Sequence, residues 1–154
     1  LALITANTGD KPFSITEALH TYFNVGDASK VQLFGLERTE YLDKAEGFVK
    51  ACQVGAVIIC EKTDHIHEDL QHELTISDFV LNRKIQIVSS GNKNVVVWNP
   101  WSNGSTAIAD LAIDDYQHFI CVEIANAASS LVAIQPGEEY RLDTRYTITS
   151  TESV

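Results

Sequence analysis

The residue of this sequence best suited to chemistry is an acid inside an apolar stretch. The segment Gln117–Ala125 reads Gln-His-Phe-Ile-Cys-Val-Glu-Ile-Ala and lacks proline and glycine, which predicts a buried β-strand. Because side chains alternate along a strand, Glu123 should share a face with Phe119 and Cys121. Burying a carboxylate is costly unless it is paired or its pKa is raised. Glu123 is therefore either a solvated acid on an edge strand or an interior acid that takes and gives a proton.

A histidine in a second apolar segment could act together with this acid. His20 lies within Leu19–Phe23, where strand alternation places it on one face with Ala18 and Tyr22. A lone histidine in such a strand is more often structural than catalytic. If His20 and Glu123 meet across one cleft, however, an imidazole facing a carboxylate is the usual equipment for general acid–base catalysis near neutral pH.

A run of acids and histidines, Asp64–Asp69, is the most conspicuous polar feature of the chain. On a strand His65 and His67 would share a face, and His72 or Glu73 could complete a set of metal ligands. The spacing does not match the His-x-His pattern of cupins, in which a glutamate follows the second histidine after three or four residues. We therefore expect a solvated polar loop here, with a metal site as the alternative.

Composition limits the partners of the chain. The net charge of −10 argues against a nucleic-acid or anionic-membrane surface, because both require clustered lysine and arginine. No apolar run reaches the 18 residues of a membrane span. Three cysteines without a Cys-x-x-Cys pair indicate the reducing cytoplasm. Phosphate-binding glycine loops and the Gly-x-Ser-x-Gly elbow of hydrolases are also missing from the sequence.

Short apolar segments separated by turn residues predict an all-β sandwich or barrel. We expect the first two segments to form a hairpin around the turn Thr8–Pro12, and a short helix in Ser105–Leu111. The expected strands are 1–7, 13–23, 31–36, 51–60, 76–80, 84–89, 94–98, 117–125, 131–135 and 139–148.

The 154 residues have room for one domain, and no repeat or linker divides them, so a single domain over residues 1–154 is expected. The chain contains no methionine, and its first residues already alternate like a strand. These two features indicate a piece of a longer protein.

Three segments carry a resemblance to a known family. Ala18–Asp27, Val97–Pro100 and Phe119–Glu123 resemble successive motifs of the hexose-6-phosphate mutarotases, or glucose-6-phosphate 1-epimerases, which are related to the aldose 1-epimerases. The resemblance runs from about Ile4 to the C-terminal region and corresponds to roughly the C-terminal half of such an enzyme. It implies an antiparallel β-sandwich that is part of a galactose-mutarotase-like supersandwich, and interconversion of the α and β anomers of an aldohexose 6-phosphate.

The resemblance also implies roles for individual residues. His20 would be the general acid and Glu123 the general base. Asp64, from the pair Thr63–Asp64, would hold sugar hydroxyls. On physical grounds Trp98 or Trp101 would supply an apolar platform for the sugar ring, with a plain core role for Trp98 as the alternative. Asn99, next to Trp98 in the same motif, is a further candidate for binding the substrate. No metal or cofactor is required for this reaction.

The same resemblance limits what this chain can do alone. In the family the phosphate is held by arginines of the N-terminal half, and Arg38, Arg83, Arg141 and Arg145 lie outside any motif assignable to phosphate. We expect these residues alone to be poorly active, and their exposed sheet edges to allow self-association.

Two other classes of protein stay open. A non-catalytic carbohydrate-binding β-sandwich would need the tryptophans and Asp64 without needing both His20 and Glu123. A cupin-like metal protein would depend on His65 and His67.

Overall fold

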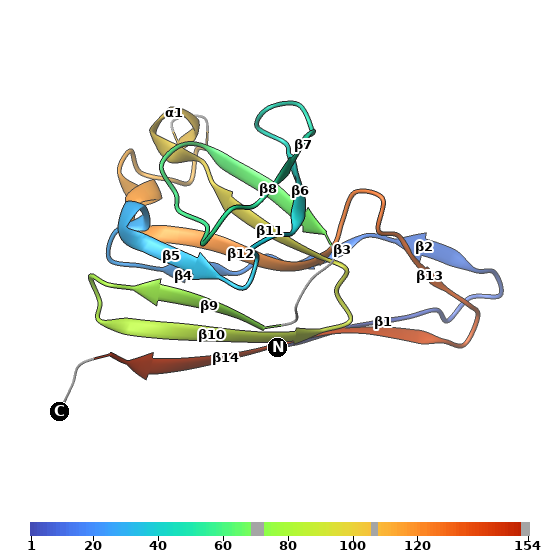
Figure 1. The fold of residues 1–154 in the computed structure, drawn as a ribbon. Coiled ribbons are helices and arrows are strands. Elements are labelled where there is room, and N and C mark those ends of the chain that lie inside the picture. Colours follow the sequence, from blue (N-terminus) through green and yellow to red (C-terminus); the bar gives the residue numbers. More distant parts are fainter. Residues whose placement is uncertain (69–72, 106–107, 152–154) are drawn as a thin grey trace.

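The computed structural model describes residues 1–68, 73–105 and 108–151, and it consists of two antiparallel sheets packed face to face (Figure 1). Short helical turns lie at one end of the sandwich, and a two-stranded ribbon extends from the other (Figure 1). The prediction of an all-β antiparallel sandwich is confirmed. In the described part of the chain no helix is long and apolar enough to cross a membrane.

The lower sheet in Figure 1 has five strands in the order β1-β14-β10-β9-β5. These strands are β1 (Ala2–Ala6), β14 (Glu139–Ser150), β10 (Arg83–Ser90), β9 (Glu73–Asp78) and β5 (Val31–Phe34).

The upper sheet has seven strands in the order β3-β12-β11-β8-β6-β7, with β4 also paired to β12. Its strands are β3 (Glu17–Leu19), β4 (Tyr22–Asn24), β6 (Glu40–Asp43), β7 (Val49–Cys52), β8 (Thr63–Glu68), β11 (Asn94–Asn99) and β12 (Phe119–Asn126). The ribbon pairs β2 (Phe13–Ile15) with β13 (Val132–Ile134).

The core lies between the two sheets and is built from alternate aliphatic residues. Ile85 and Ile87 point inward from β10, and Ile120, Val122 and Ile124 point toward them from β12. Burying each such side chain stabilises the fold by about 1.5–3 kcal/mol. The opposite face of β12, which carries Glu123, is therefore turned away from this core.

Strand β12 lies inside the seven-stranded sheet, between β11 on one side and β3 and β4 on the other, and all of its residues are buried. The interpretation of Glu123 as a solvated acid on an edge strand is therefore wrong. The strand begins later than predicted, because Gln117 and His118 belong to the 3₁₀ helix η2 (Asp115–His118).

The predicted hairpin between the first two segments is wrong. Strand β1 pairs with β14, and the segment expected to be one strand is divided into β2, β3 and β4. The side chain of Asn7 donates to the carbonyl oxygens of Lys11 and Ile134, and the N–H of Gly137 donates to the carbonyl oxygen of Asn7. These bonds fix the turn against the distant β13–β14 connection.

Two further strand predictions need correction. The segment expected as a strand over 51–60 is β-structure only up to Cys52, followed by a single bridge between Leu33 and Val57. The run of acids and histidines is not a polar loop, since residues up to Glu68 form β8 between β11 and β6. Asp69 and His72 lie outside the described residues.

The short helix is displaced from its predicted position. It forms at Trp101–Ser105 as α1, and residues 108–111 are not helical, while 106–107 lie outside the described residues. The short connection between β10 and β11, which contains Gly91, carries the chain from one sheet to the other. Gly91 has a φ of 82° in this turn, and a Cβ there would collide with the carbonyl oxygen of Arg141.

Candidate active site

The pairing of β3 and β4 with β12 brings His20 to Glu123. Leu19 at the end of β3 lies opposite Ile124, and Tyr22 at the start of β4 lies opposite Cys121. Both strands thus keep one register against β12, and the intervening His20 falls opposite Glu123. The ladder is interrupted at this point by a tight turn in which the N–H of Thr21 donates to the carbonyl oxygen of Leu19.

The two side chains are in direct contact. Nε2 of His20 lies 3.1 Å from Oε1 of Glu123, and the side chain of His20 is 47% exposed while that of Glu123 is 10% exposed. Burial raises the pKa of Glu123, the neighbouring His20 lowers it, and Asp64 raises it. The arrangement provides an acid–base pair in which the carboxylate is shielded and the imidazole faces solvent.

Two rows of side chains across the seven-stranded sheet form the floor of a pocket. In one row Glu123, Val96 and Ile66 are register partners on β12, β11 and β8, and in the next row Trp98 lies opposite Asp64. The pocket encloses about 270 Å³. Its lining residues are Ala18, His20, Lys44, Asp64, Ile66, Val96, Trp98, Glu123, Ala125 and Ala127.

Asp64 and Glu123 stand on opposite sides of this pocket. They lie on β8 and β12, which are separated by β11, so the two strands are about 10 Å apart. The aliphatic Val96 and the indole of Trp98 lie between them on the middle strand. Two carboxylates that flank an apolar floor can hold a small polyhydroxylated ring by its hydroxyls while its flat face rests on the floor.

Lys44 is a pocket residue that sequence reasoning missed. It follows β6, and its N–H donates to the carbonyl oxygen of Asp64 at 2.8 Å. Its Nζ lies 3.0 Å from Oδ2 of Asp64. Only the long-range pairing of β6 with β8 brings the two together, and no local pattern around Lys44 indicates that pairing.

Aromatic rings surround His20 and hold its imidazole in place. The ring of Tyr22 stacks on it with centroids 5.0 Å apart, and Trp98 meets its edge at 6.1 Å. Phe119 lies behind both rings, 5.2 Å from Tyr22 and 5.8 Å from Trp98. Trp98 thus lines the pocket and belongs to this cluster at the same time.

The structure does not bring Asn99 to the pocket. Its side chain is fully buried, and its Nδ2 donates to the carbonyl oxygens of Tyr116 and Phe119 at 2.8 and 2.9 Å. Its Oδ1 accepts from the N–H of Trp101. These bonds join β11 to α1 and η2, so the geometry gives Asn99 a structural role.

His65 and His67 point to the face of β8 opposite to Asp64 and lie outside the pocket. Nε2 of His65 is 3.4 Å from Oδ2 of Asp43, and Nδ1 of His67 is 2.9 Å from Oγ1 of Thr39. Over the described residues no three histidine, cysteine, aspartate or glutamate side chains converge as a metal ion would need. Within the part of the chain that the structure describes, the histidine pair therefore lacks the further ligands of the cupin-like site considered from the sequence.

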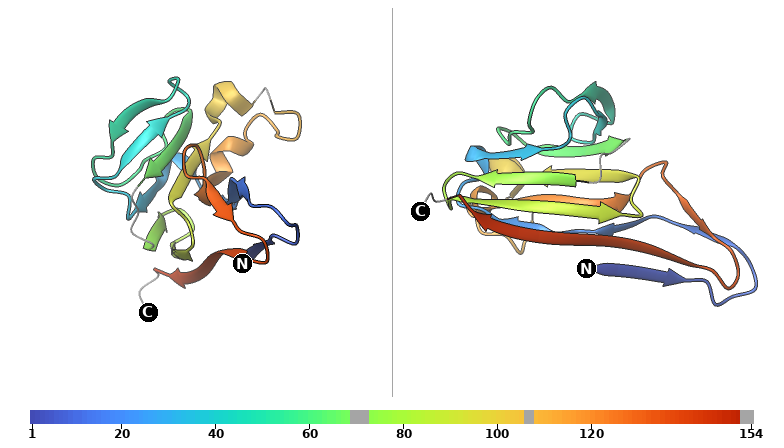
Figure 2. Two further views of the ribbon diagram at one scale, coloured as in Figure 1. Left: turned by 90° about the vertical axis from the view of Figure 1, so that its right-hand side faces the viewer. Right: turned by 60° about the horizontal axis from the view of Figure 1, so that its bottom comes forward.

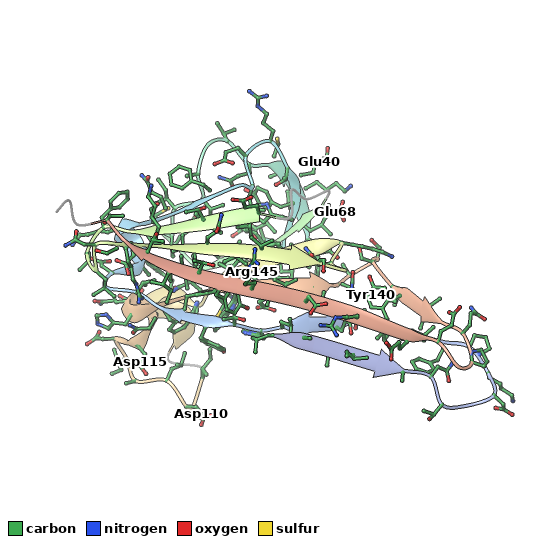
Figure 3. All side chains as sticks on the ribbon, turned by 90° about the horizontal axis from the view of Figure 1, so that it is seen from below. Glu40, Glu68, Asp110, Asp115, Tyr140 and Arg145 are labelled. Atoms are coloured by element: carbon green, nitrogen blue, oxygen red, sulfur yellow. The ribbon has the colours of Figure 1, made fainter. Side chains whose placement is uncertain are left out.

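The arginines of the chain lie away from the pocket. Arg141 and Arg145 belong to β14 of the other sheet, where Figure 3 shows Arg145 near the middle of the strand. Arg83 contacts Asp78, and Arg38 lies in the loop before β6. Among the described residues, Lys44 is the only lysine or arginine that lines the pocket.

Comparison with known proteins identifies the fold and the family of this chain. The fold is galactose-mutarotase-like: a galactose mutarotase-like protein from Clostridium acetobutylicum superposes with a TM-score of 0.68 at 14% identity, covering 97% of this chain and 52% of that one. Residues 1–147 match the family aldose 1-epimerase, and the chain belongs to this family.

Three relatives show which members of the family this chain is similar to. A Cenchrus ciliaris protein, provisionally named a glucose-6-phosphate 1-epimerase, is 35% identical over 136 residues, which are 88% of this chain and 41% of that protein. An Escherichia coli protein with the same provisional name is 37% identical over 119 residues, 77% of this chain and 40% of its own length. A crystal structure from Salmonella typhimurium, titled provisionally as a mutarotase, has a TM-score of 0.85 at 30% identity and covers 91% of this chain and 47% of that one. The chain therefore spans about 40% of the length of the curated relatives.

Proposed function

We propose that the protein interconverts the α and β anomers of an aldohexose 6-phosphate, with glucose 6-phosphate as the first candidate. The observation that carries this proposal is the contact of His20 with Glu123 at the edge of an open pocket. Membership of the aldose 1-epimerase family supports the reaction, and the names of two relatives support the phosphorylated hexose.

The reaction needs two proton transfers that this pair can make. Glu123 removes the proton of the C1 hydroxyl, and His20 gives a proton to the ring oxygen, so that the C1–O5 bond breaks and an aldehyde forms. Rotation about C1–C2 presents the other face of the aldehyde. On ring closure His20 takes back its proton from O5, and Glu123 returns its proton to O1, which restores both residues. Each positioned transfer is typically worth about 10²–10⁴-fold in rate.

Burial suits Glu123 to the role of base. Because desolvation by its neighbours is the largest influence and raises its pKa, its carboxylate holds a proton more strongly than a free glutamate does. The sugar would lie over Val96 and Trp98, with hydroxyls toward Asp64. The reaction uses only proton transfers, so no metal or cofactor enters the proposal.

Among the residues that the structure describes, the phosphate has no assigned partner, since the arginines lie away from the pocket. We assign it to residues beyond them, because the named relatives are longer than this chain. We also propose a cytoplasmic location, since phosphorylated sugars are cytoplasmic metabolites.

The experiment compares anomer exchange in wild type, Glu123→Gln and His20→Asn, by NMR exchange between the two anomeric protons of glucose 6-phosphate. The full-length gene product is used, with Glu139→Gln and His118→Asn as controls at exposed positions. Both site variants should lose at least about 10²-fold in rate while the controls keep theirs.

Ligand titration of the same variants separates catalysis from binding. Retained sugar binding with lost exchange supports the assignment of His20 and Glu123 as acid and base. Exchange that survives in either site variant at the wild-type rate would remove that residue from the mechanism. Binding without exchange in the wild type would favour a non-catalytic carbohydrate-binding module.

A further inference from the structure

We infer that Lys44 is a positioning residue of this pocket: its ammonium group holds the carboxylate of Asp64 in the orientation in which it can accept a hydroxyl of the sugar. This inference rests on the proposed function and adds a residue to it that neither the motifs nor the comparisons assign.

The first step is the position of Lys44 in the sheet. Asp43 at the end of β6 lies opposite His65 on β8, so the next residue, Lys44, falls opposite Asp64. The bond from the N–H of Lys44 to the carbonyl oxygen of Asp64 fixes its backbone there. Its side chain then lies on the face of the sheet that carries Trp98 and Glu123, and it lines the same pocket.

The second step is the state of the Asp64 carboxylate. Oδ2 is 3.0 Å from Nζ of Lys44, and the side chain of Asp64 is only 17% exposed. Oδ1 is buried, so Oδ2 is the carboxylate oxygen that can face the pocket. A carboxylate oxygen has two lone pairs, so Oδ2 can accept a sugar hydroxyl while it stays in contact with the ammonium group of Lys44.

The third step is the effect of Lys44 on the whole site. The charged and titratable groups around Glu123 are His20, Asp64, Lys44, Cys121 and Tyr22. Burial is the largest cause that raises the pKa of Glu123, and Asp64 raises it further, while His20 and Lys44 lower it. The positive charge of Lys44 therefore counteracts the effect of Asp64 on the pKa of Glu123.

Lys44 also has donors to spare for the ligand. An ammonium group carries three N–H donors, and the contact with Asp64 uses one of them. Its side chain is 40% exposed, so the remaining donors are accessible from the pocket. A neighbouring sugar oxygen can accept one of them, which would place adjacent hydroxyls on Asp64 and Lys44.

The test replaces Lys44 by Met, which keeps the length of the chain and removes its charge, and by Arg, which keeps the charge. Lys30→Met is the matched control, because Lys30 pairs with Asp27 at 2.9 Å far from the pocket. Anomer exchange of glucose 6-phosphate is measured against pH and substrate concentration in the full-length gene product.

For Lys44→Met we expect KM to rise about tenfold, which corresponds to about 1.4 kcal/mol of binding. The acid limb of kcat/KM should move up by about half to one pH unit, because Glu123 loses a nearby positive charge. Lys44→Arg should restore the pH profile and part of KM. A purely structural lysine would change the melting temperature and leave the acid limb in place.

The outcomes distinguish a failure of the inference about Lys44 from a failure of the proposed function. An active wild type whose KM and pH profile are unchanged by Lys44→Met overturns the inference and leaves the proposed function intact. A change equal to that of Lys30→Met overturns it as well. A wild type without anomer exchange overturns the proposed function, and the role of Lys44 is lost with it.

Discussion

The carboxylate of Glu123 meets two demands that oppose each other. As a base it must ionise, yet it lies on an inner strand of its sheet with only 10% of its side chain exposed. The contact with His20 and the nearby Lys44 offset part of this burial. Function at this residue is therefore expected to lower the stability of the fold.

Glu123→Gln should reveal this conflict in the pH dependence of stability. The folded-state pKa of Glu123 is raised above its unfolded value of about 4.3, so the folded state holds the proton more tightly and the contribution of Glu123 falls as pH rises through this range. We expect Glu123→Gln to melt at a higher temperature than wild type at pH 8, and the difference to shrink toward pH 4. Calorimetry at several pH values measures it. A difference in melting temperature that stays constant from pH 4 to 8 would contradict the argument.

At the scale of the element, β8 has two faces with different tasks. Asp64 points to the pocket, while His67 on the opposite face is fully buried. The hydroxyl of Thr39 donates to the carbonyl oxygen of Leu36, so it accepts from Nδ1–H of His67. The other ring nitrogen, Nε2, is then without a proton and without a partner. This arrangement accommodates only the neutral form of the His67 imidazole.

Strand β8 should therefore make the fold sensitive to acid. Burial lowers the pKa of His67 to about 3, with a further contribution from His65. The stability contributed by neutral His67 is present above its unfolded pKa of about 6.5 and is lost as pH falls toward 3. Between pH 7 and 4.5 we expect wild type to lose roughly 2–3 kcal/mol more than His67→Asn, which keeps a donor for Thr39 but cannot take up a proton.

Urea unfolding at matched pH values measures this difference. The comparison concerns the slope with pH, so any constant loss of packing in His67→Asn cancels. Parallel pH dependences of the two proteins would show that His67 does not carry the acid sensitivity.

The strand faces on which Glu123 and His20 lie could be predicted from the sequence, but the contacts of Asn99 and Lys44 could not. The apolar run around Glu123 and the alternation around His20 are local patterns, and they correctly predict which faces the two side chains occupy. The motif that contains Asn99 could not show that its amide oxygen accepts from the N–H of Trp101 at the start of α1. Lys44 was missed because its position depends on pairing between strands far apart in the chain.

At the scale of the whole molecule, the sandwich has edges that its own strands leave open. Strand β1 pairs with β14 only as far as Asp143, and beyond Thr144 no strand of the described residues covers that side of β14 (Figure 2). Strand β7 forms one end of the seven-stranded sheet, and both Val49 at its start and the preceding Phe48 are exposed. Open edges of this kind invite a further strand, from the same protein or from a second copy.

The last prediction concerns the activity and the self-association of this chain on its own. The pocket is open to solvent and His20 is half exposed, so water competes for the acid and the base, and the phosphate has no assigned partner. We therefore expect the 154-residue chain to equilibrate α-glucose 6-phosphate at least about 100-fold more slowly than the longer Escherichia coli relative, since water exclusion and positioning each contribute to such rates. Polarimetry of both proteins under one set of conditions makes the comparison, and light scattering shows whether the chain pairs with a second copy. Equal rates in a monomeric 154-residue chain would mean that these residues already enclose the complete site.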